Sequence, residues 1–378
     1  MRVCLVYDCL YPFSVGGAER WYRSLAERLD AAGAEVTYLT LRQWPRGADP
    51  RLGGVDVVAV GPRMQLYTGG RRRILPPLVF GLGVLVHLLR HGRRYDAVQT
   101  ASFPYFSLLA AASARRLHRY RLVVDWVEIW TREYWREYLG PLGGIGWWVQ
   151  GLCARTRHRA FAYSRLHAER LRSLGFRGEV TVLEGLYAGG HEPPEPIPSE
   201  PLVVFAGRLI PEKRAPALVP AIGRARERLP ELRCTIFGDG PDRPKLLRLI
   251  AESSLDGAVE APGFVDANLV ETAMRRALCF VLPSRREGYG LAVVEAAALG
   301  TPSIVVSHPD NAAAELVEDG VNGVVAPSAE PDELAAAILR VHEAGEELRA
   351  STRDWYRRNA RRLSIDTSLE HVLAAYGE

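Results

Sequence analysis

Two runs of alternating strand and helix signals constrain what this chain can fold into. Along the 378 residues, short apolar segments rich in β-branched side chains alternate with longer helical segments, and the alternation stops mid-chain and restarts. Such alternation is typical of parallel sheets that are covered by helices on both faces. A chain of this length exceeds the usual single core. We therefore predict an α/β fold with two doubly wound parallel-sheet domains.

The predicted elements fall on either side of a proline-rich segment, Ala188–Pro201, in which no regular element fits. Before it, strands are predicted at Arg2–Tyr7, Glu35–Thr40, Val55–Val60, Asp96–Thr100, Arg121–Asp125 and Glu179–Leu183, and a helix at Ala18–Ala32. After it, strands are predicted at Leu202–Ala206, Leu232–Phe237, Leu278–Leu282 and Ser303–Val306, and helices at Ala215–Leu229, Arg243–Glu252 and Leu291–Leu299. This pattern predicts domains at 1–190 and 201–356, with a linker at 191–200.

The two halves of the chain differ in charge. Residues 1–190 carry 27 basic and 15 acidic side chains, whereas residues 191–378 carry 21 and 29. The first half is therefore expected to attract an anionic surface or substrate, although basic faces that only solvate the fold would give the same count. We expect no nucleic-acid partner. The five cysteines lack metal-ligand spacing and the N-terminus lacks a signal-peptide core, which predicts reduced thiols and a cytoplasmic protein.

Two glutamates, Glu287 and Glu295, stand eight residues apart across a glycine loop that leads into an apolar helix. Gly288 and Gly290 have no Cβ, so the loop backbone can approach a ligand closely. The amide groups at the start of the helix can then hold a diphosphate. Glu295 lies in the first turns of the helix, where it can accept hydrogen bonds from a ribose, and Glu287 faces the reacting group.

A second segment places two cations after a predicted strand. Gly207 and Arg208 follow the strand directly, and Lys213 comes five residues after Arg208. Arg208 can bind two oxygens at once, while Lys213 acts as a compact point charge. Both would stabilise a departing diphosphate as its charge grows. The alternative is an exposed turn, but a chain with lysine only at 213 and 245 places one of them here.

Together, the two segments resemble the paired-glutamate and arginine–lysine motifs of the retaining, nucleotide-sugar-dependent glycosyltransferases of family four. The resemblance is strongest from Leu202 to Pro327. It implies the GT-B fold, in which two Rossmann-like domains face each other across a cleft and a C-terminal helix, here 357–378, crosses back to the first domain. It also implies that the donor is contacted by Gly238, Phe264, Val265, Tyr289 and Leu291.

The first half matches this family only in part. Gly16 and Gly17 match a loop that closes over the donor, and their amides could reach a diphosphate. The family often has a histidine after the strand at Arg121–Val124, where this chain has Asp125 and Glu128 instead. Either carboxylate could bind the acceptor or the donor sugar, since ligands collect at strand ends of open parallel sheets. The alternative is that both cap the next helix.

Apolar, aromatic and basic residues gather in the first half. Five of the eight tryptophans lie between Trp126 and Trp148, where they could stack on sugars, lie at a lipid–water boundary or pack in the core. Arg71–Arg73 precede the apolar run Ile74–Leu89, which is too short and interrupted to span a bilayer. This run could lie on an anionic membrane, in which case salt-sensitive vesicle binding is expected. A buried helix with charged ends is the alternative.

The resemblance implies retaining transfer of a sugar from a UDP- or GDP-linked donor to a hydroxyl acceptor. The basic, aromatic first half suggests a lipid-linked acceptor, and a cell-envelope or secondary-metabolite glycan is the alternative. No Asp-x-Asp pair occurs, so neither a metal nor another cofactor is expected. The enzyme would be cytoplasmic, with a peripheral position at the membrane. Rival interpretations are a nucleotide-sugar epimerase of similar fold and a non-catalytic membrane-surface protein. A dinucleotide oxidoreductase is disfavoured, because Gly81-x-Gly83 lies within an apolar run rather than after a strand.

Overall fold

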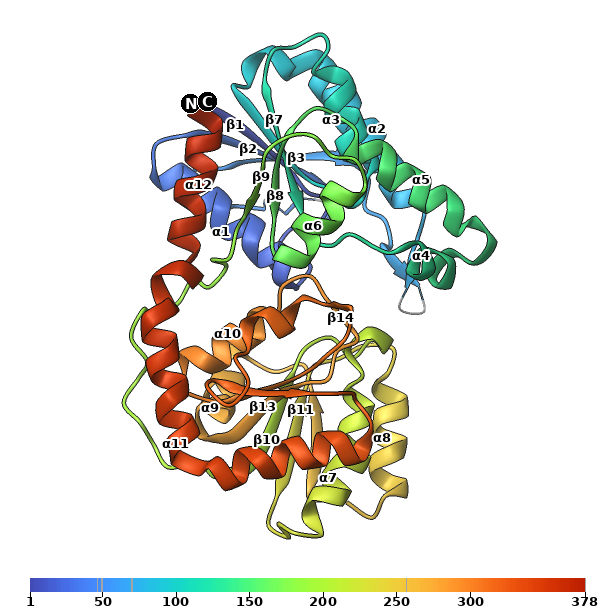
Figure 1. The fold of residues 1–378 in the computed structure, drawn as a ribbon. Coiled ribbons are helices and arrows are strands. Elements are labelled where there is room, and N and C mark those ends of the chain that lie inside the picture. The colour runs from blue at the N-terminus through green and yellow to red at the C-terminus, as the bar shows by residue number, and fades with distance from the viewer. Residues whose placement is uncertain (46, 49, 69–70, 256, 378) are drawn as a thin grey trace. The chain divides into compact units, whose positions relative to one another are not determined.

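The computed structural model describes every residue except 46, 49, 69–70, 256 and 378. The chain divides into two compact units (Figure 1). Unit 1 consists of Met1–Leu186 together with the residues from Ile365 onward, and unit 2 consists of Tyr187–Ser364. Each unit contains a parallel sheet flanked by helices, so the prediction of two doubly wound parallel sheets is confirmed.

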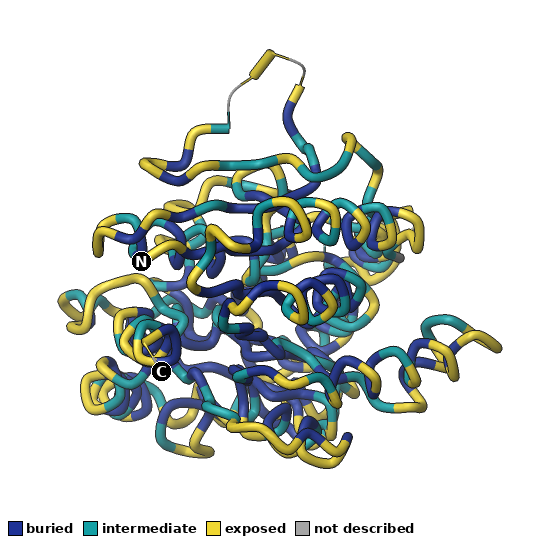
Figure 2. The backbone as a smooth tube through the Cα atoms, turned by 90° about the horizontal axis from the view of Figure 1, so that it is seen from above, coloured by how far each residue is buried: buried dark blue, intermediate teal, exposed yellow. Residues whose placement is uncertain are grey.

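In the described part of unit 1, seven parallel strands form one sheet in the order β3, β2, β1, β6, β7, β8, β9. Their bounds are Arg2–Val6 (β1), Glu35–Leu41 (β2), Asp56–Gly61 (β3), Ala97–Ala101 (β6), Arg121–Trp126 (β7), Arg159–Ala162 (β8) and Val180–Val182 (β9). The central strands are almost entirely buried (Figure 2), as expected when helices cover both faces. The strand order reverses between β1 and β6, and ligands of open α/β sheets collect at such switch points.

Helices cover both faces of this sheet. One face packs on α2 (Leu75–His91), α3 (Phe106–Ala114) and α5 (Gly143–Ala154) through a core that includes Val98 and Val124. Successive side chains of a strand point to opposite faces, so Gln99 and Asp125 face the other side. That side is covered by α1 (Gly17–Ala31) and α12 (Ile365–Gly377), whose tyrosines reach Asp125 and Gln99 respectively. Two further helices are α4 (Arg132–Leu139) and α6 (Arg165–Ser173).

Within the residues that the structure describes, unit 2 has six parallel strands in the order β12, β11, β10, β13, β15, β17. Their bounds are Glu200–Ala206 (β10), Arg233–Phe237 (β11), Val259–Gly263 (β12), Ala277–Leu282 (β13), Ser303–Val306 (β15) and Gly323–Ala326 (β17). The helices are α7 (Leu218–Arg226), α8 (Arg243–Glu252), α9 (Ala267–Arg276), α10 (Leu291–Ala298) and α11 (Pro331–Leu363). The helix predicted at Ala215–Leu229 is shorter than expected, since a 3₁₀ turn containing Pro216 occupies Ala215–Ala217.

The C-terminal region is divided between the two units. Its helical segment is broken at Ser364, where the backbone is extended, so α11 ends in unit 2 and α12 lies in unit 1. The proline-rich segment that was predicted as a linker is bound to unit 2. There the hydroxyl of Tyr356 donates to the carbonyl of Gly190 at 2.6 Å, and Arg353 donates to that of Pro194 at 2.7 Å.

Candidate functional site

Three neighbouring strands of unit 2 end at glycines whose backbones contact one another. The amide of Gly207, after β10, donates to the carbonyl of Phe237 at 3.1 Å, and the amide of Gly238, after β11, donates to the carbonyl of Gly263 at 2.8 Å. Gly238 has φ +129°, and a Cβ there would collide with the carbonyl oxygen of Gly207. The strand ends are therefore lined with bare backbone, which lets a ligand approach closely.

The predicted cations follow this line of glycines. Arg208 is exposed directly after Gly207, and Lys213 ends a 3₁₀ turn that begins at Pro211. The Nζ of Lys213 forms an ion pair with Oε1 of Glu287, and the two side chains are only 19% and 9% exposed. The structure thus brings together Lys213 and Glu287, two predicted site residues that are 74 positions apart.

The backbone fixes the two segments against each other. The amide of Arg285 donates to the carbonyl of Glu212 at 2.8 Å, next to the Lys213–Glu287 pair. Arg286–Glu287 form the short strand β14, which pairs in parallel with β16 (Asp310–Asn311). Because its backbone is held in this ladder, the carboxylate of Glu287 is presented from a rigid support.

The glycine loop ends at the start of α10. Gly288 and Tyr289 are buried, and Gly290 has φ +106°, a conformation that favours glycine. A Cβ on Gly290 would also lie 2.6 Å from the Cβ of Ala313, so the loop packs too tightly there for a side chain. α10 then begins at Leu291 without a side-chain cap on its first amides, as a helix terminus that binds an anion requires.

Glu295 lies in the second turn of α10 and is half-buried. Burial raises the pKa of the nearby Tyr187, and the negative charge of Glu295 adds to this effect. Beyond β12, Phe264 is 70% exposed and is followed by the half-buried Val265. An aromatic ring this exposed beside the strand ends offers a stacking surface. A contact of Phe264 or Val265 with the donor stays a prediction.

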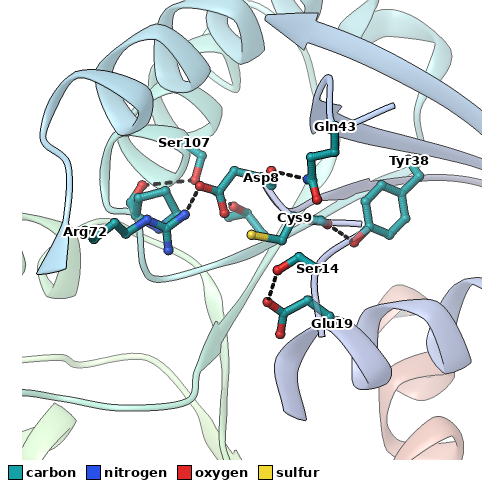
Figure 3. Close-up of polar contacts among 10 residues, drawn as sticks. Asp8, Cys9, Ser14, Glu19, Tyr38, Gln43, Arg72 and Ser107 are labelled. Carbon is teal, nitrogen blue, oxygen red and sulfur yellow. Dashed lines mark hydrogen bonds and ion pairs between the residues drawn. The ribbon is translucent and has the colours of Figure 1, made fainter. Parts of the chain in front are cut away.

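The double glycine of unit 1 is shaped by a neighbouring carboxylate. Gly16 precedes α1, and a Cβ on it would collide with the carboxylate of Glu19, whereas Gly17 has open space around its Cβ position. Glu19 accepts a hydrogen bond from the hydroxyl of Ser14 at 3.0 Å (Figure 3). A side chain at position 16 would therefore displace the carboxylate of Glu19, which lies beside the amides that were predicted to bind a diphosphate.

A buried ion pair lies at the carboxyl end of β1. Asp8 is fully buried and forms an ion pair with Arg72, whose side chain is 8% exposed (Figure 3). The guanidinium of Arg72 also lies 5.1 Å from the centre of the Phe103 ring, and its backbone amide donates to the hydroxyl of Tyr138 at 2.8 Å. Arg72 thus anchors the hairpin of β4 (Tyr67–Thr68) and β5 (Arg71–Arg72) to the strand ends.

Arg72 belongs to the basic run that precedes the apolar segment Ile74–Leu89, but its side chain is only 8% exposed and is paired with Asp8, so it does not contribute to a basic surface. Sequence reasoning did not select Asp8 as a site residue. The sequence feature that could have indicated Asp8 is its position as an acidic residue directly after the predicted strand Arg2–Tyr7.

Asp125 lies inside unit 1 with no exposed surface. Its carboxylate accepts a hydrogen bond from the hydroxyl of Tyr22 at 2.7 Å and from Nε2 of Gln99 at 2.8 and 2.9 Å. Burial raises the pKa of Asp125 to about 6, although these hydrogen bonds lower it in part. The prediction that Asp125 contacts a sugar is not supported by this geometry, because both oxygens face buried donors.

Glu128 differs from Asp125, since it is half-buried and its Oε2 accepts a hydrogen bond from Nε1 of Trp130 at 3.0 Å. Neither carboxylate caps the next helix. The cap of α4 is Thr131, whose hydroxyl accepts from the amide of Tyr134 at 3.2 Å. A sugar contact by Glu128 stays a prediction. Among the described residues, no group of three or more histidine, cysteine, aspartate or glutamate side chains is arranged to hold a metal ion.

Comparison with known families accounts for both units. Residues 191–362 match the family described as "Glycosyl transferases group 1", and residues 16–184 match the "Glycosyl transferase 4-like domain". The chain belongs to the family-four type of glycosyltransferases. The resemblance predicted from the Glu287–Glu295 and Arg208–Lys213 motifs is thereby confirmed, and with it the GT-B fold.

Individual relatives agree with this assignment. The chain is 32% identical over 141 residues to the alpha-D-kanosaminyltransferase of Streptomyces kanamyceticus, a match that covers 37% of this chain and 36% of that enzyme. The chain thus spans about a third of the length of this relative. Among solved structures, sucrose-phosphate synthase from Thermosynechococcus elongatus has a TM-score of 0.82 at 18% identity, covering 99% of this chain and 98% of that one. HepE of Anabaena, solved in complex with UDP, has a TM-score of 0.76 at 18% identity and full coverage of both chains.

Proposed function

We propose that this glycosyltransferase moves a sugar, with retention of configuration, from a nucleoside diphosphate sugar to a hydroxyl acceptor. The observation that carries the proposal is the Lys213–Glu287 pair beside the glycine-lined strand ends of unit 2. A cation, a carboxylate and bare backbone amides in one place suit a diphosphate joined to a polyhydroxylated sugar. HepE, which shares the fold, was solved with UDP, so UDP is our first candidate nucleotide and GDP the second.

In this proposal each residue has a separate task. Arg208, Lys213 and the amides at the start of α10 hold the diphosphate, Glu287 binds hydroxyls of the donor sugar, and Glu295 binds the ribose. The bond between the anomeric carbon and the phosphate oxygen breaks while the acceptor oxygen bonds to the same face of that carbon. The acceptor proton passes to the departing phosphate oxygen. The cations stabilise the charge that grows on the diphosphate.

The proposal extends to conditions that distinguish it from other transferase chemistries. We propose that no metal ion takes part, so activity should persist in excess chelator. Loss of activity that a divalent ion restores would overturn this part. We also propose a cytoplasmic location, and an acceptor that is lipid-linked or is a cell-envelope or secondary-metabolite glycan.

The test is product analysis with UDP- and GDP-sugars in the presence and absence of acceptor alcohols. We expect an acceptor-dependent product whose anomeric proton coupling shows the donor's configuration. Donor converted without an acceptor to an epimeric sugar nucleotide would replace the proposal with an epimerase, and an inverted product would refute the mechanism.

Thermal shifts with UDP and GDP give a second measurement, since a ligand that binds the folded protein raises its melting temperature. The shift should shrink in Lys213→Ala. It should persist in Lys245→Ala, which removes the other lysine of the chain, an exposed residue on α8.

A further inference from the structure

Two helices of unit 1 expose rows of large apolar side chains. On α2, Leu75, Leu78, Leu82, Val86 and Leu89 recur every three or four residues, so they form one stripe, and Leu82 is 63% exposed. On α5, Ile145, Trp148 and Leu152 form a similar stripe, and Trp148 is 62% exposed. We call these rows the α2 stripe and the α5 stripe.

The two stripes point away from the same face of the sheet. The opposite sides of α2 and α5 belong to one core, with Phe80 and Val84 of α2 fully buried. α3 lies between these helices, because α2 approaches it closely at Gly81 and α5 is joined to its start by the hydrogen bond from Tyr105 to Gln150 at 2.8 Å. Both helices pack inward on this layer, so both stripes form its outward surface.

α2 does not cross a membrane in this fold. The apolar run was predicted to be too short to span a bilayer, but the helical stretch Leu75–Arg94 is long and apolar enough to do so by length and composition, and 39% of its apolar window is buried inside the unit. Pulling α2 into a bilayer would remove Phe80, Val84 and Leu88 from the core. Lying on a surface, in contrast, leaves those contacts intact.

The surroundings of the stripes are strongly basic. Residues 56–124 contain eleven arginines, of which Arg72 is paired with Asp8 and does not face the surface, and two acidic residues, Asp56 and Asp96, of which Asp96 pairs with Arg2. Arg90, Arg93 and Arg94 are exposed where α2 ends, and Arg155 and Arg157 are exposed where α5 ends. Because each of these helices connects parallel strands, they run in the same direction, so these arginines gather at one end of the layer.

We propose that the α2 and α5 stripes dock unit 1 on the surface of an anionic lipid bilayer. The apolar side chains enter the boundary of the acyl chains, as in amphipathic interfacial helices, and Trp148 lies at the depth that tryptophan prefers. The arginines contact the anionic headgroups. A second copy of this chain fits the surface less well, since association through it would bring like charges together. The inference does not depend on the proposed transfer reaction.

The test is flotation of the full chain with vesicles of phosphatidylcholine alone or mixed with phosphatidylglycerol. We expect binding to the anionic vesicles that weakens as salt rises, and little binding to phosphatidylcholine. The double variant Leu82→Ser/Trp148→Ser should bind the anionic vesicles about tenfold or more weakly than the wild type. The double variant Arg93→Gln/Arg94→Gln should also weaken binding to the anionic vesicles by about tenfold or more.

Matched variants in unit 2 provide the controls. The double variant Leu247→Ser/Leu269→Ser removes two exposed apolar side chains of unit 2. The double variant Lys245→Gln/Arg248→Gln removes two exposed cations of unit 2. Both controls should bind vesicles like the wild type. The proposal is overturned if the wild type fails to bind anionic vesicles at low salt, or if stripe and control variants lose binding equally. If the wild type is a dimer in solution and the double variant Leu82→Ser/Trp148→Ser is a monomer, the surface would instead bind a second copy of the chain.

Discussion

The buried carboxyl of Asp125 predicts an unusual dependence of stability on pH. Burial raises its pKa from the ordinary 3.8 to about 6. In the unfolded chain the pKa returns to its ordinary value, so between about pH 4 and pH 6 the folded state binds the proton and the unfolded state releases it. The free energy of unfolding therefore falls as pH rises through this interval, and the contribution is constant above it.

The magnitude follows from the shift. A change of one pKa unit corresponds to 1.36 kcal/mol, so the shift from 3.8 to about 6 is worth about 3 kcal/mol. Asp125 is fully buried, so solvent screening does not reduce this value appreciably. In Asp125→Asn nothing titrates at this position. The unfolding free energy of the variant relative to the wild type should therefore increase by about 3 kcal/mol between about pH 4 and pH 7.

The assay is urea unfolding of both proteins at several pH values, followed by tryptophan fluorescence. Seven of the eight tryptophans precede residue 187 and so report on unit 1. Other ionisable groups contribute equally to both proteins and cancel in the difference. Curves for the two proteins that stay parallel over the whole pH range would refute the reasoning.

The other predictions concern the two predicted site regions. Lys213→Ala should lower kcat about 10²–10³-fold by removing charge stabilisation from the diphosphate, and steady-state kinetics showing only a raised KM would contradict this. Glu295→Ala should weaken nucleotide binding about 10–100-fold in calorimetry, since it removes hydrogen bonds to a charged group; unchanged affinity would remove the ribose assignment. Arg72→Ala should destabilise unit 1 by about 3–5 kcal/mol in urea unfolding, because it leaves Asp8 buried and unpaired. Adding Asp8→Asn should recover part of that loss, and no recovery would count against the ion pair.

The repeated strand–helix pattern and the glycine loops were predictable from sequence, because both leave local signals. Apolar periodicity located the central strands to within about two residues, and the helix at Arg243–Glu252 was predicted with its observed bounds. β8, β12 and β17 were missed. β8 and β17 have only four residues each and no clear flanking signal, and β12 contains Pro262. In unit 2 the two motifs led us to predict Lys213 and Glu287 for one site, and the structure pairs them, while the roles of Arg208 and Glu295 stay predictions.

The environment of Asp125 could not be predicted, because its partners are distant in sequence. Tyr22 lies 103 positions away, and Gln99, which binds Asp125, is held in turn by Tyr376, 277 positions from Gln99. Nothing local separates such a carboxylate from one that binds a ligand. Similarly, Arg72 sits within a run of three arginines, and only the three-dimensional packing shows that it is buried. The α2 stripe could not be recognised from the sequence, because the helix is apolar around most of its circumference and its exposed face does not differ from its buried face.

The position of α12 has a consequence for biosynthesis. This helix is part of unit 1, where the side chain of Arg121 donates to the carbonyl of Tyr376 and the hydroxyl of Tyr376 donates to Gln99 beside Asp125. In the chain, however, α12 follows all of unit 2. Domains generally fold in the order of their synthesis, yet here the ribosome must translate the whole of the second unit before α12 can cover its face of the sheet in the first. The half that is made first is completed last, and until then it exposes the surface that α12 later covers.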